Sequence, residues 1–145
     1  MNTEILHKEI DLIQACISRM AHNSFLLKGW AVSLVAVILA IDKQSSQPDI
    51  LGAITLIPLL CFWILDAFFL QAEKRFREMY KWVLHARPSG DYSFLYDLNP
   101  HRFKKETDSL VKVLFSVTLA FFYGPPIAIV LFIIIAKACS LTGGN

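Results

Sequence analysis

The sequence predicts an all-α membrane protein with three transmembrane helices, the first two of which extend into a cytoplasmic helical hairpin. Apolar residues make up 55% of the 145 residues, and the mean hydropathy is +0.50. They gather in three blocks, at residues 24–41, 50–70 and 110–136. A helix needs about 20 mostly apolar residues to cross a bilayer. We therefore expect a single membrane domain over residues 1–145, with one span in each block.

The first expected helix begins outside the membrane and enters it without a break. Ahead of the first block an apolar residue recurs at steps of three and four, which is the pattern of a heptad seam. The seam consists of Leu6, Ile10, Ile13, Ile17 and Met20. This pattern predicts a cytoplasmic helix over residues 1–28 that continues into the first span at 24–41. The seam pairs only within the hairpin, or it also packs against neighbouring subunits of an oligomer.

The second expected helix starts with the span at 50–70 and continues beyond it. Apolar residues then fall on one helical face as far as residue 83. Pro88 is expected to end the helix, because proline has no backbone N–H to donate. The rest of the cytoplasmic segment 71–109 contains the turn signals PSGD and NP. The aromatic run YSFLY between them is expected at the membrane interface or as a cap on the hairpin.

The third expected span, at 110–136, combines a pattern of small residues with two prolines. Small residues four apart allow two helices to approach closely in lipid. They are Ser116, Ala120, Gly124 and Ala128. Pro125 and Pro126 remove two backbone donors, so we expect a kink or a break at that point. The bend either serves packing or lines a pore.

Three charged residues are expected to form an intramembrane cluster. Asp66 lies inside the second apolar block, and Lys28 and Lys112 can reach the same level in the other two spans. An ionisable residue within a span is a functional hypothesis, and its partner has to be identified. Lys28 is the first choice and Lys112 the second. Asp66 then belongs to a charge pair that locks the helices, to an ion or proton path, or to a snorkelling position at the membrane edge.

The distribution of basic residues predicts the orientation of the chain. Twelve of the 14 Lys and Arg residues lie before the first span, between the second and third spans, or at the start of the third, and only Lys43 and Lys137 lie elsewhere. Basic residues are enriched on the cytoplasmic side of membrane proteins. We therefore expect a bacterial inner-membrane protein with a cytoplasmic N-terminus, an outward-facing turn at 42–49 and a periplasmic C-terminus.

The sequence contains no pattern typical of an enzyme. The four histidines lack the spacing of metal ligands, and there is no Gly-rich phosphate loop and no nucleophile elbow. We expect no catalytic site, no metal and no cofactor. The net charge of +2 is too small to indicate a nucleic-acid partner.

The stretch ISRMAHNSFLLKGWAVSLVAVILAI resembles small bacterial membrane proteins encoded in anti-phage defence loci. These include SLATT-like effectors and the accessory membrane protein of RADAR-type systems. The resemblance covers roughly residues 5–80 and concerns a cytoplasmic helix, a short span, a turn, and a second span with a basic extension. It implies homo-oligomerisation and a membrane-damaging or membrane-anchoring role in defence.

The function expected from these observations is non-enzymatic. We expect a homo-oligomer in contact with membrane lipid that acts as a pore-like effector or accessory of anti-phage defence. One alternative is a scaffold that recruits a soluble partner of the defence system on the cytoplasmic side. Another is a small ion- or proton-coupled transporter that uses Asp66.

Overall fold

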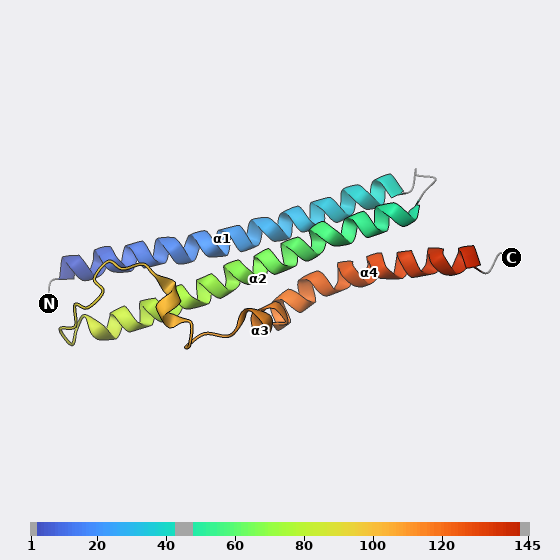
Figure 1. The fold of residues 1–145 in the computed structure, drawn as a ribbon. Coiled ribbons are helices and arrows are strands. Elements are labelled where there is room, and N and C mark those ends of the chain that lie inside the picture. Colours follow the sequence, from blue (N-terminus) through green and yellow to red (C-terminus); the bar gives the residue numbers. More distant parts are fainter. Residues whose placement is uncertain (1–2, 43–47, 143–145) are drawn as a thin grey trace. The chain divides into compact units, whose positions relative to one another are not determined.

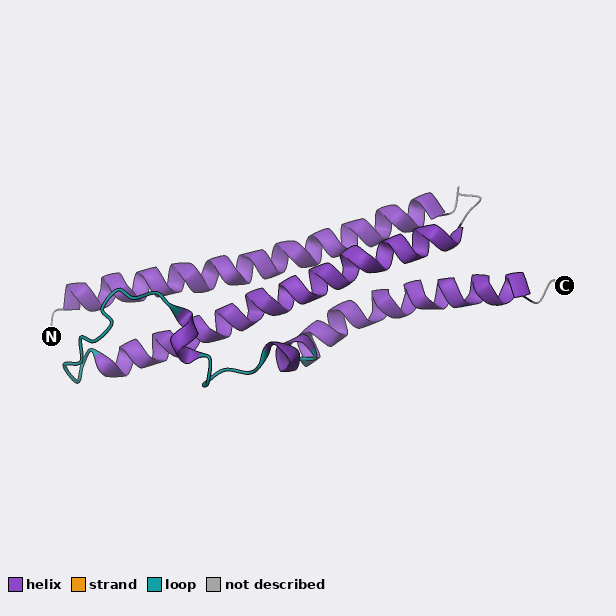
Figure 2. Ribbon diagram, in the orientation of Figure 1, coloured by secondary structure: helices purple, strands orange, loops and turns teal. Residues whose placement is uncertain are grey.

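The computed structural model describes residues 3–42 and 48–142, and Figure 1 shows that helices make up most of this part. The helices are α1 at Thr3–Asp42, α2 at Pro48–Ala86, the 3-10 helix η1 at Pro100–Phe103, α3 at Leu110–Leu114 and α4 at Val117–Thr142. Figure 2 shows loops between them, and the described residues include no strand. The predicted all-α class is confirmed.

In the described part of the chain, three helices are long and apolar enough to cross a membrane, as predicted. The stretches are Thr3–Ile41, Ile54–Ala86 and Val117–Ala136. Helices α1 and α2 have 40 and 39 residues, whereas a span needs about 20. The chain is therefore a membrane protein whose first two helices are each about twice as long as a crossing requires.

The predicted ends of the first two helices agree closely with the structure. Helix α2 begins at Pro48, where a proline is favourable because the first N–H groups of a helix have no partner within it. It ends at Ala86, two residues before Pro88, as predicted. The turn expected to face outward, at 42–49, falls mainly on residues 43–47, which lie outside the described part of the chain.

The chain divides into two compact units, and both long helices contribute to each. The first unit consists of Met1–Ser24 and Ala67–Val113, and the second of Phe25–Asp66 and Leu114–Asn145. Each unit therefore joins segments that lie far apart in the sequence.

The core of the first unit is built where the early part of α1 packs on the late part of α2. Its buried members are Ile13, Cys16, Phe76, Met79, Val83 and Phe103. Ile13 is only 1% exposed, and the other four residues of the predicted seam pack against this core with part of their surface open. The alternative that the seam pairs within the hairpin is confirmed. Ile13 has no surface left for another subunit, so its assignment to an oligomer contact is wrong.

The segment between α2 and α3 folds back onto this core. Asn99 caps η1 by accepting a hydrogen bond from the backbone N–H of His101 at 3.1 Å. This short helix inserts Phe103, which is 4% exposed, into the core beside Trp82. The predicted turn signals are therefore the points at which the segment reverses to cover the hairpin.

Of the two expected alternatives at Pro125 and Pro126, the break is wrong, and the kink stays a prediction. Helix α4 continues through both prolines, and the helical path is interrupted earlier, at residues 115 and 116. A transmembrane helix tolerates proline because neighbouring helices and local adjustment satisfy the freed carbonyls. The block at 110–136 is thus a short α3 followed by a continuous span.

An indole side chain explains why the interruption lies where it does. The Nε1 atom of Trp63 in α2 donates a hydrogen bond to the carbonyl oxygen of Leu114 at 3.0 Å. This carbonyl ends α3 and would otherwise lack a partner. The Trp63 ring also meets Phe115 edge to face, with ring centroids 5.7 Å apart. Trp63 therefore stabilises the break through a contact that comes from another helix of the second unit.

Candidate functional site

Two charged residues of the second unit meet in one buried site. The Nζ atom of Lys28 in α1 lies 2.6 Å from Oδ2 of Asp66 in α2. The Asp66 side chain is 0% exposed and the Lys28 side chain 21% exposed. The predicted pairing of Asp66 with Lys28 is confirmed.

Tyr123 of α4 completes the site. Its hydroxyl lies 3.2 Å from the same Oδ2 atom of Asp66, to which it donates. Its ring is fully buried and stacks on Trp63 with centroids 6.4 Å apart. We name Lys28, Asp66 and Tyr123 the carboxylate site. The sequence did contain a signal for Tyr123, because a phenol hydroxyl inside an apolar span needs a partner.

Lys112 has a different partner from the one expected. Its Nζ atom lies 2.6 Å from Oδ1 of Asp108, and its side chain is 74% exposed. The second choice of partner for Asp66 is therefore wrong. The reason is local, because Asp108 precedes Lys112 by four residues and this spacing brings the two side chains together.

The carboxylate site connects α1, α2 and α4 within the second unit. Taking an ion pair out of water is costly, but the cost falls when the remaining lone pairs accept hydrogen bonds. Here one carboxylate oxygen receives both an ammonium group and a phenol hydroxyl. This arrangement suits a fixed packing contact, because a carboxylate that exchanges protons or ions must be reached by water.

The small residues of α4 lie mostly on its surface. Ala120, Gly124 and Ala128 are exposed, and Ser116, which directly precedes α4, is partly buried. A Cβ atom added at Gly124 would meet no atom within 4 Å. The packing of this chain therefore does not require small residues along this face.

The first unit contains a second buried ion pair, which the sequence analysis did not identify. Arg87 binds Glu9 through two contacts, Nε to Oε2 at 2.7 Å and Nη2 to Oε1 at 2.8 Å. The two side chains are 1% and 3% exposed. The hydrogen bond to Glu9 raises the pKa of Arg87 above its usual value. No pattern in the sequence links these residues, because 78 positions separate them.

This ion pair also holds the loop that follows α2. Nη1 of Arg87 donates to the carbonyl oxygens of Asp91 and Ser93, and the N–H of Tyr96 donates to Oε1 of Glu9 at 3.2 Å. A hydrogen bond from Ser93 lowers the pKa of the Asp91 carboxyl group. The aromatic run therefore caps the hairpin, which is one of the two positions expected for it.

The same loop holds two aromatic residues in an unfavourable backbone conformation. Phe94 and Tyr96 have φ values of 56° and 59°, in the left-handed region that bulky residues rarely adopt. The Phe94 ring is 56% exposed, and the guanidinium carbon of Arg102 lies 3.6 Å from its centroid. Arg102 also lies over Trp82, 4.9 Å from the ring centroid. Backbone strain of this kind is often found at binding surfaces.

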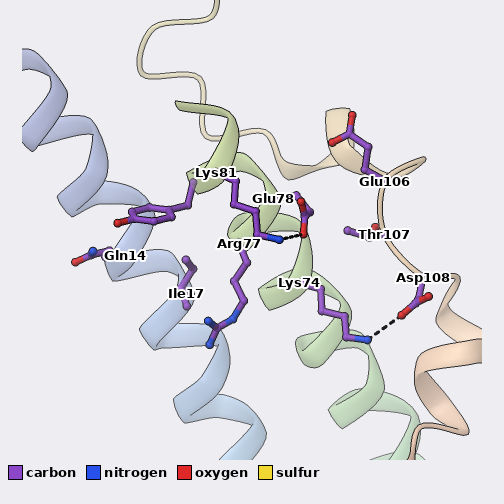
Figure 3. A pocket seen from close by; sticks show the side chains of 10 residues that line it. Gln14, Ile17, Lys74, Arg77, Glu78, Lys81, Glu106, Thr107 and Asp108 are labelled. Carbon is purple, nitrogen blue, oxygen red and sulfur yellow. Dashed lines mark hydrogen bonds and ion pairs between the residues drawn. The ribbon is translucent and has the colours of Figure 1, made fainter. Parts of the chain in front are cut away.

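A broad polar cavity of about 770 Å³ lies on the first unit (Figure 3). Its charged lining residues are Lys74, Arg77, Glu78, Lys81, Glu106 and Asp108. Figure 3 shows Lys81 directed at Glu78 and Lys74 at Asp108. Arg77 binds the carboxylate of Glu73, so all three cations of this cavity have carboxylate partners. The three positive and three negative charges that line the cavity therefore balance.

The structure places the predicted residues in three separate groups. The seam lies in the core of the first unit, Lys28 and Asp66 form the carboxylate site, and the small residues lie on the exposed face of α4. Within the described part of the chain, no three His, Cys, Asp or Glu side chains come together in a way that could hold a metal ion.

Comparison with known proteins does not assign the chain to a family. No family model, no curated protein and no solved structure matches it.

Proposed function

We propose that the chain is a non-enzymatic inner-membrane protein that self-assembles into a pore-like complex and acts as an effector or accessory of anti-phage defence. The observation that carries this proposal is the exposed face of small residues on α4. The resemblance of residues 5–80 to defence-locus membrane proteins supplies the biological setting.

The α4 face fits a second membrane helix. Gly124 has open space around it, so its size is not explained by contacts within the chain. In lipid, small residues four apart bring two helix backbones close enough for extensive van der Waals contact. Bulky neighbours stand next to this face, with Val117 86% and Phe121 82% exposed. Small and large residues side by side provide the holes and knobs that a neighbouring copy of α4 would need.

The carboxylate site supports a fixed packing contact between helices rather than the site of a transporter. Asp66 has no exposed surface and accepts from both Lys28 and Tyr123. A coupled transporter needs a carboxylate that alternates between water and substrate. The transporter alternative is therefore the weaker of the two.

The size of the purified particle tests self-assembly. Gly124→Leu and Ala120→Leu should reduce the particle mass in detergent, because the added side chains keep two α4 helices apart. Thr118→Leu adds a similar apolar group to an exposed position on a different face of α4 and should leave the mass unchanged. Dye release from vesicles containing the protein should fall with the mass. An unchanged particle mass for both Gly124→Leu and Ala120→Leu would exclude this face as the interface.

The proposed orientation needs its own test. We place the N-terminus and the segment 71–109 in the cytoplasm, on the basis of the distribution of Lys and Arg. Single cysteines are placed at Ser46 or Ser89 in a chain without its natural cysteines, and an impermeant reagent is added to intact cells. The cysteine at Ser46 should be labelled and the one at Ser89 should not. Labelling at Ser89 with none at Ser46 would reverse the orientation.

One observation favours the scaffold alternative. Tyr92, Phe94 and Tyr96 are each at least 40% exposed on a loop that forms hydrogen bonds with both Glu9 and Arg87. Exposed aromatic residues are typical of interaction surfaces. If the chain is a scaffold, Phe94→Ser should abolish co-purification with the product of an adjacent defence gene and leave the particle mass and dye release unchanged.

A further inference from the structure

One buried arginine has no negative partner among the residues that the structure describes. In the described part of the chain the buried arginines are Arg75, 8% exposed, and Arg87, 1% exposed. Arg87 binds Glu9. Arg75 forms no ion pair with any described residue, and its Nε atom is buried without a hydrogen-bond partner among them. A buried charge is costly unless it is paired, so the position of Arg75 calls for an anion from outside the chain.

Arg75 lines a cavity of about 360 Å³ that other polar groups share. Gln71 lies one turn earlier on α2, and Lys104, Thr107 and Ser109 come from the segment that leads to α3. A water molecule occupies about 30 Å³ in the liquid, so the cavity has room for a tetrahedral oxyanion. The cavity is thus large enough and polar enough for an anionic ligand.

The donors of this cavity are only partly used within the chain. Ser109 Oγ accepts from the N–H of Lys112 at 3.3 Å and can still donate its own proton. Thr107 donates to the carbonyl oxygen of Phe103 at 3.1 Å and can only accept. Lys104 is exposed and forms no ion pair with a described residue. Two cations and one hydroxyl therefore remain available to a ligand.

The carboxylate that lines the cavity, Asp108, is neutralised by two other lysines. Lys74 Nζ lies 2.9 Å from Oδ2 of Asp108, and Lys112 Nζ lies 2.6 Å from Oδ1. The amide of Gln71 donates to the backbone carbonyl of Asp108 at 2.9 Å, which fixes this segment over α2. With Arg75 and Lys104 added, positive charge exceeds negative charge around the cavity. This differs from the larger cavity of Figure 3, where each of the three cations has a carboxylate partner.

We propose that this cavity binds a phosphate group, with Arg75 and Lys104 as its cationic ligands and Ser109 as a hydroxyl donor. A guanidinium group offers several N–H donors in a planar arrangement that matches phosphate oxygens. The phosphate belongs to a lipid headgroup or to a small soluble molecule, since the recognition chemistry is the same. Leu110 lines the cavity and Val111 follows it; they are 37% and 65% exposed and offer an apolar surface to acyl chains.

Two probes distinguish the sources of the phosphate. Mass spectrometry of the intact protein in detergent measures the binding of phosphatidylglycerol against that of a diacylglycerol with the same chains and no phosphate. Calorimetry with inorganic phosphate measures binding of the soluble ion. The parent protein should bind at least one phosphate probe, and phosphatidylglycerol should bind more tightly than diacylglycerol if the ligand is a lipid.

Charge-neutral variants locate the site. Arg75→Gln and Lys104→Gln should each weaken phosphate binding by about tenfold or more, because each removes a charge-assisted hydrogen bond. Lys105→Gln removes a charge from the next residue, which does not line the cavity, and should have little effect. Lys104 is exposed, so its variant tests the site even if Arg75→Gln impairs folding.

The possible results are decisive in either direction. Loss of phosphatidylglycerol binding in the two cavity variants assigns a lipid, and loss of inorganic phosphate binding alone assigns a soluble ligand. The proposal is overturned if the parent binds neither probe, or if Lys105→Gln weakens binding as much as Lys104→Gln.

Discussion

The carboxylate site predicts an asymmetry between its two charged members. Lys28→Met keeps most of the side-chain volume and leaves Asp66, which is 0% exposed, without its cation. Removing one partner of a buried ion pair costs about 3–5 kcal/mol. Asp66→Asn leaves the ammonium group of Lys28, which is 21% exposed and can extend toward the membrane surface. The amide oxygen can still accept from Tyr123, so we expect a smaller loss, about 1.5–3 kcal/mol.

The double variant separates coupling from the individual effects. With both charges removed, neither group is buried without a partner, so the double variant should be more stable than Lys28→Met alone. The free energy of unfolding can be followed by loss of helical circular dichroism as SDS is added to the protein in mild detergent. Lys112→Met is the control, because that lysine is 74% exposed and bound to Asp108; its effect should stay within about 0.5 kcal/mol.

Two results would refute this reasoning. Equal losses for Lys28→Met and Asp66→Asn would mean that exposure does not determine the cost of the unpaired charge. Strictly additive losses in the double variant would mean that the 2.6 Å contact contributes no coupling energy.

Three other perturbations have defined outcomes. Glu9→Gln should speed hydrogen exchange of the Tyr96 amide by about 100-fold or more, since loss of a buried ion-pair partner costs about 3–5 kcal/mol; unchanged exchange in mass-spectrometric measurements would contradict the role of Glu9 in the loop. Trp63→Phe removes the donor to the Leu114 carbonyl and should lower the melting temperature measured by circular dichroism, and an unaltered melting temperature would show that the indole does not stabilise the break. Hydrogen bonds from Lys112 and Lys74 lower the pKa of the Asp108 carboxyl group in the folded state. The stabilising contribution of Asp108 is therefore present above the unfolded pKa of about 3.9, and it is lost as the pH falls through the lower pKa of the folded state. The stability difference between the parent and Asp108→Asn should therefore shrink as the pH drops below about 4, and a difference that grows there would contradict this assignment.

The sequence predicted the long helices because their signals are local and periodic. Apolar blocks of spanning length and the three-four spacing of the seam depend only on neighbouring residues. Pro88 marks the end of the second helix for the same local reason. The pairing of Lys28 with Asp66 could also be inferred, because two charges in apolar helices at a similar depth leave few alternatives.

The contacts that the sequence did not reveal are those between distant segments. Neither Glu9 nor Arg87 stands out among the charged residues around it, and only the fold of the first unit brings them together. The break before α4 depends on Trp63, so the prolines alone pointed to the wrong position. Depth in the membrane alone favours Asp66 as the partner of Lys112, but Asp108 lies only four residues away in the sequence and binds it instead.

Each unit is divided between distant stretches of sequence, and this determines when each unit can close during synthesis. Residues 25–66 of the second unit are synthesised between the two parts of the first unit. Glu9 is therefore synthesised 78 residues before Arg87, so their ion pair can form only after the second long helix has been made. Neither unit corresponds to a continuous fragment, so truncation from either end removes part of a packed interior. The first unit can thus close around Arg87, and the second around Tyr123, only after both long helices have been synthesised.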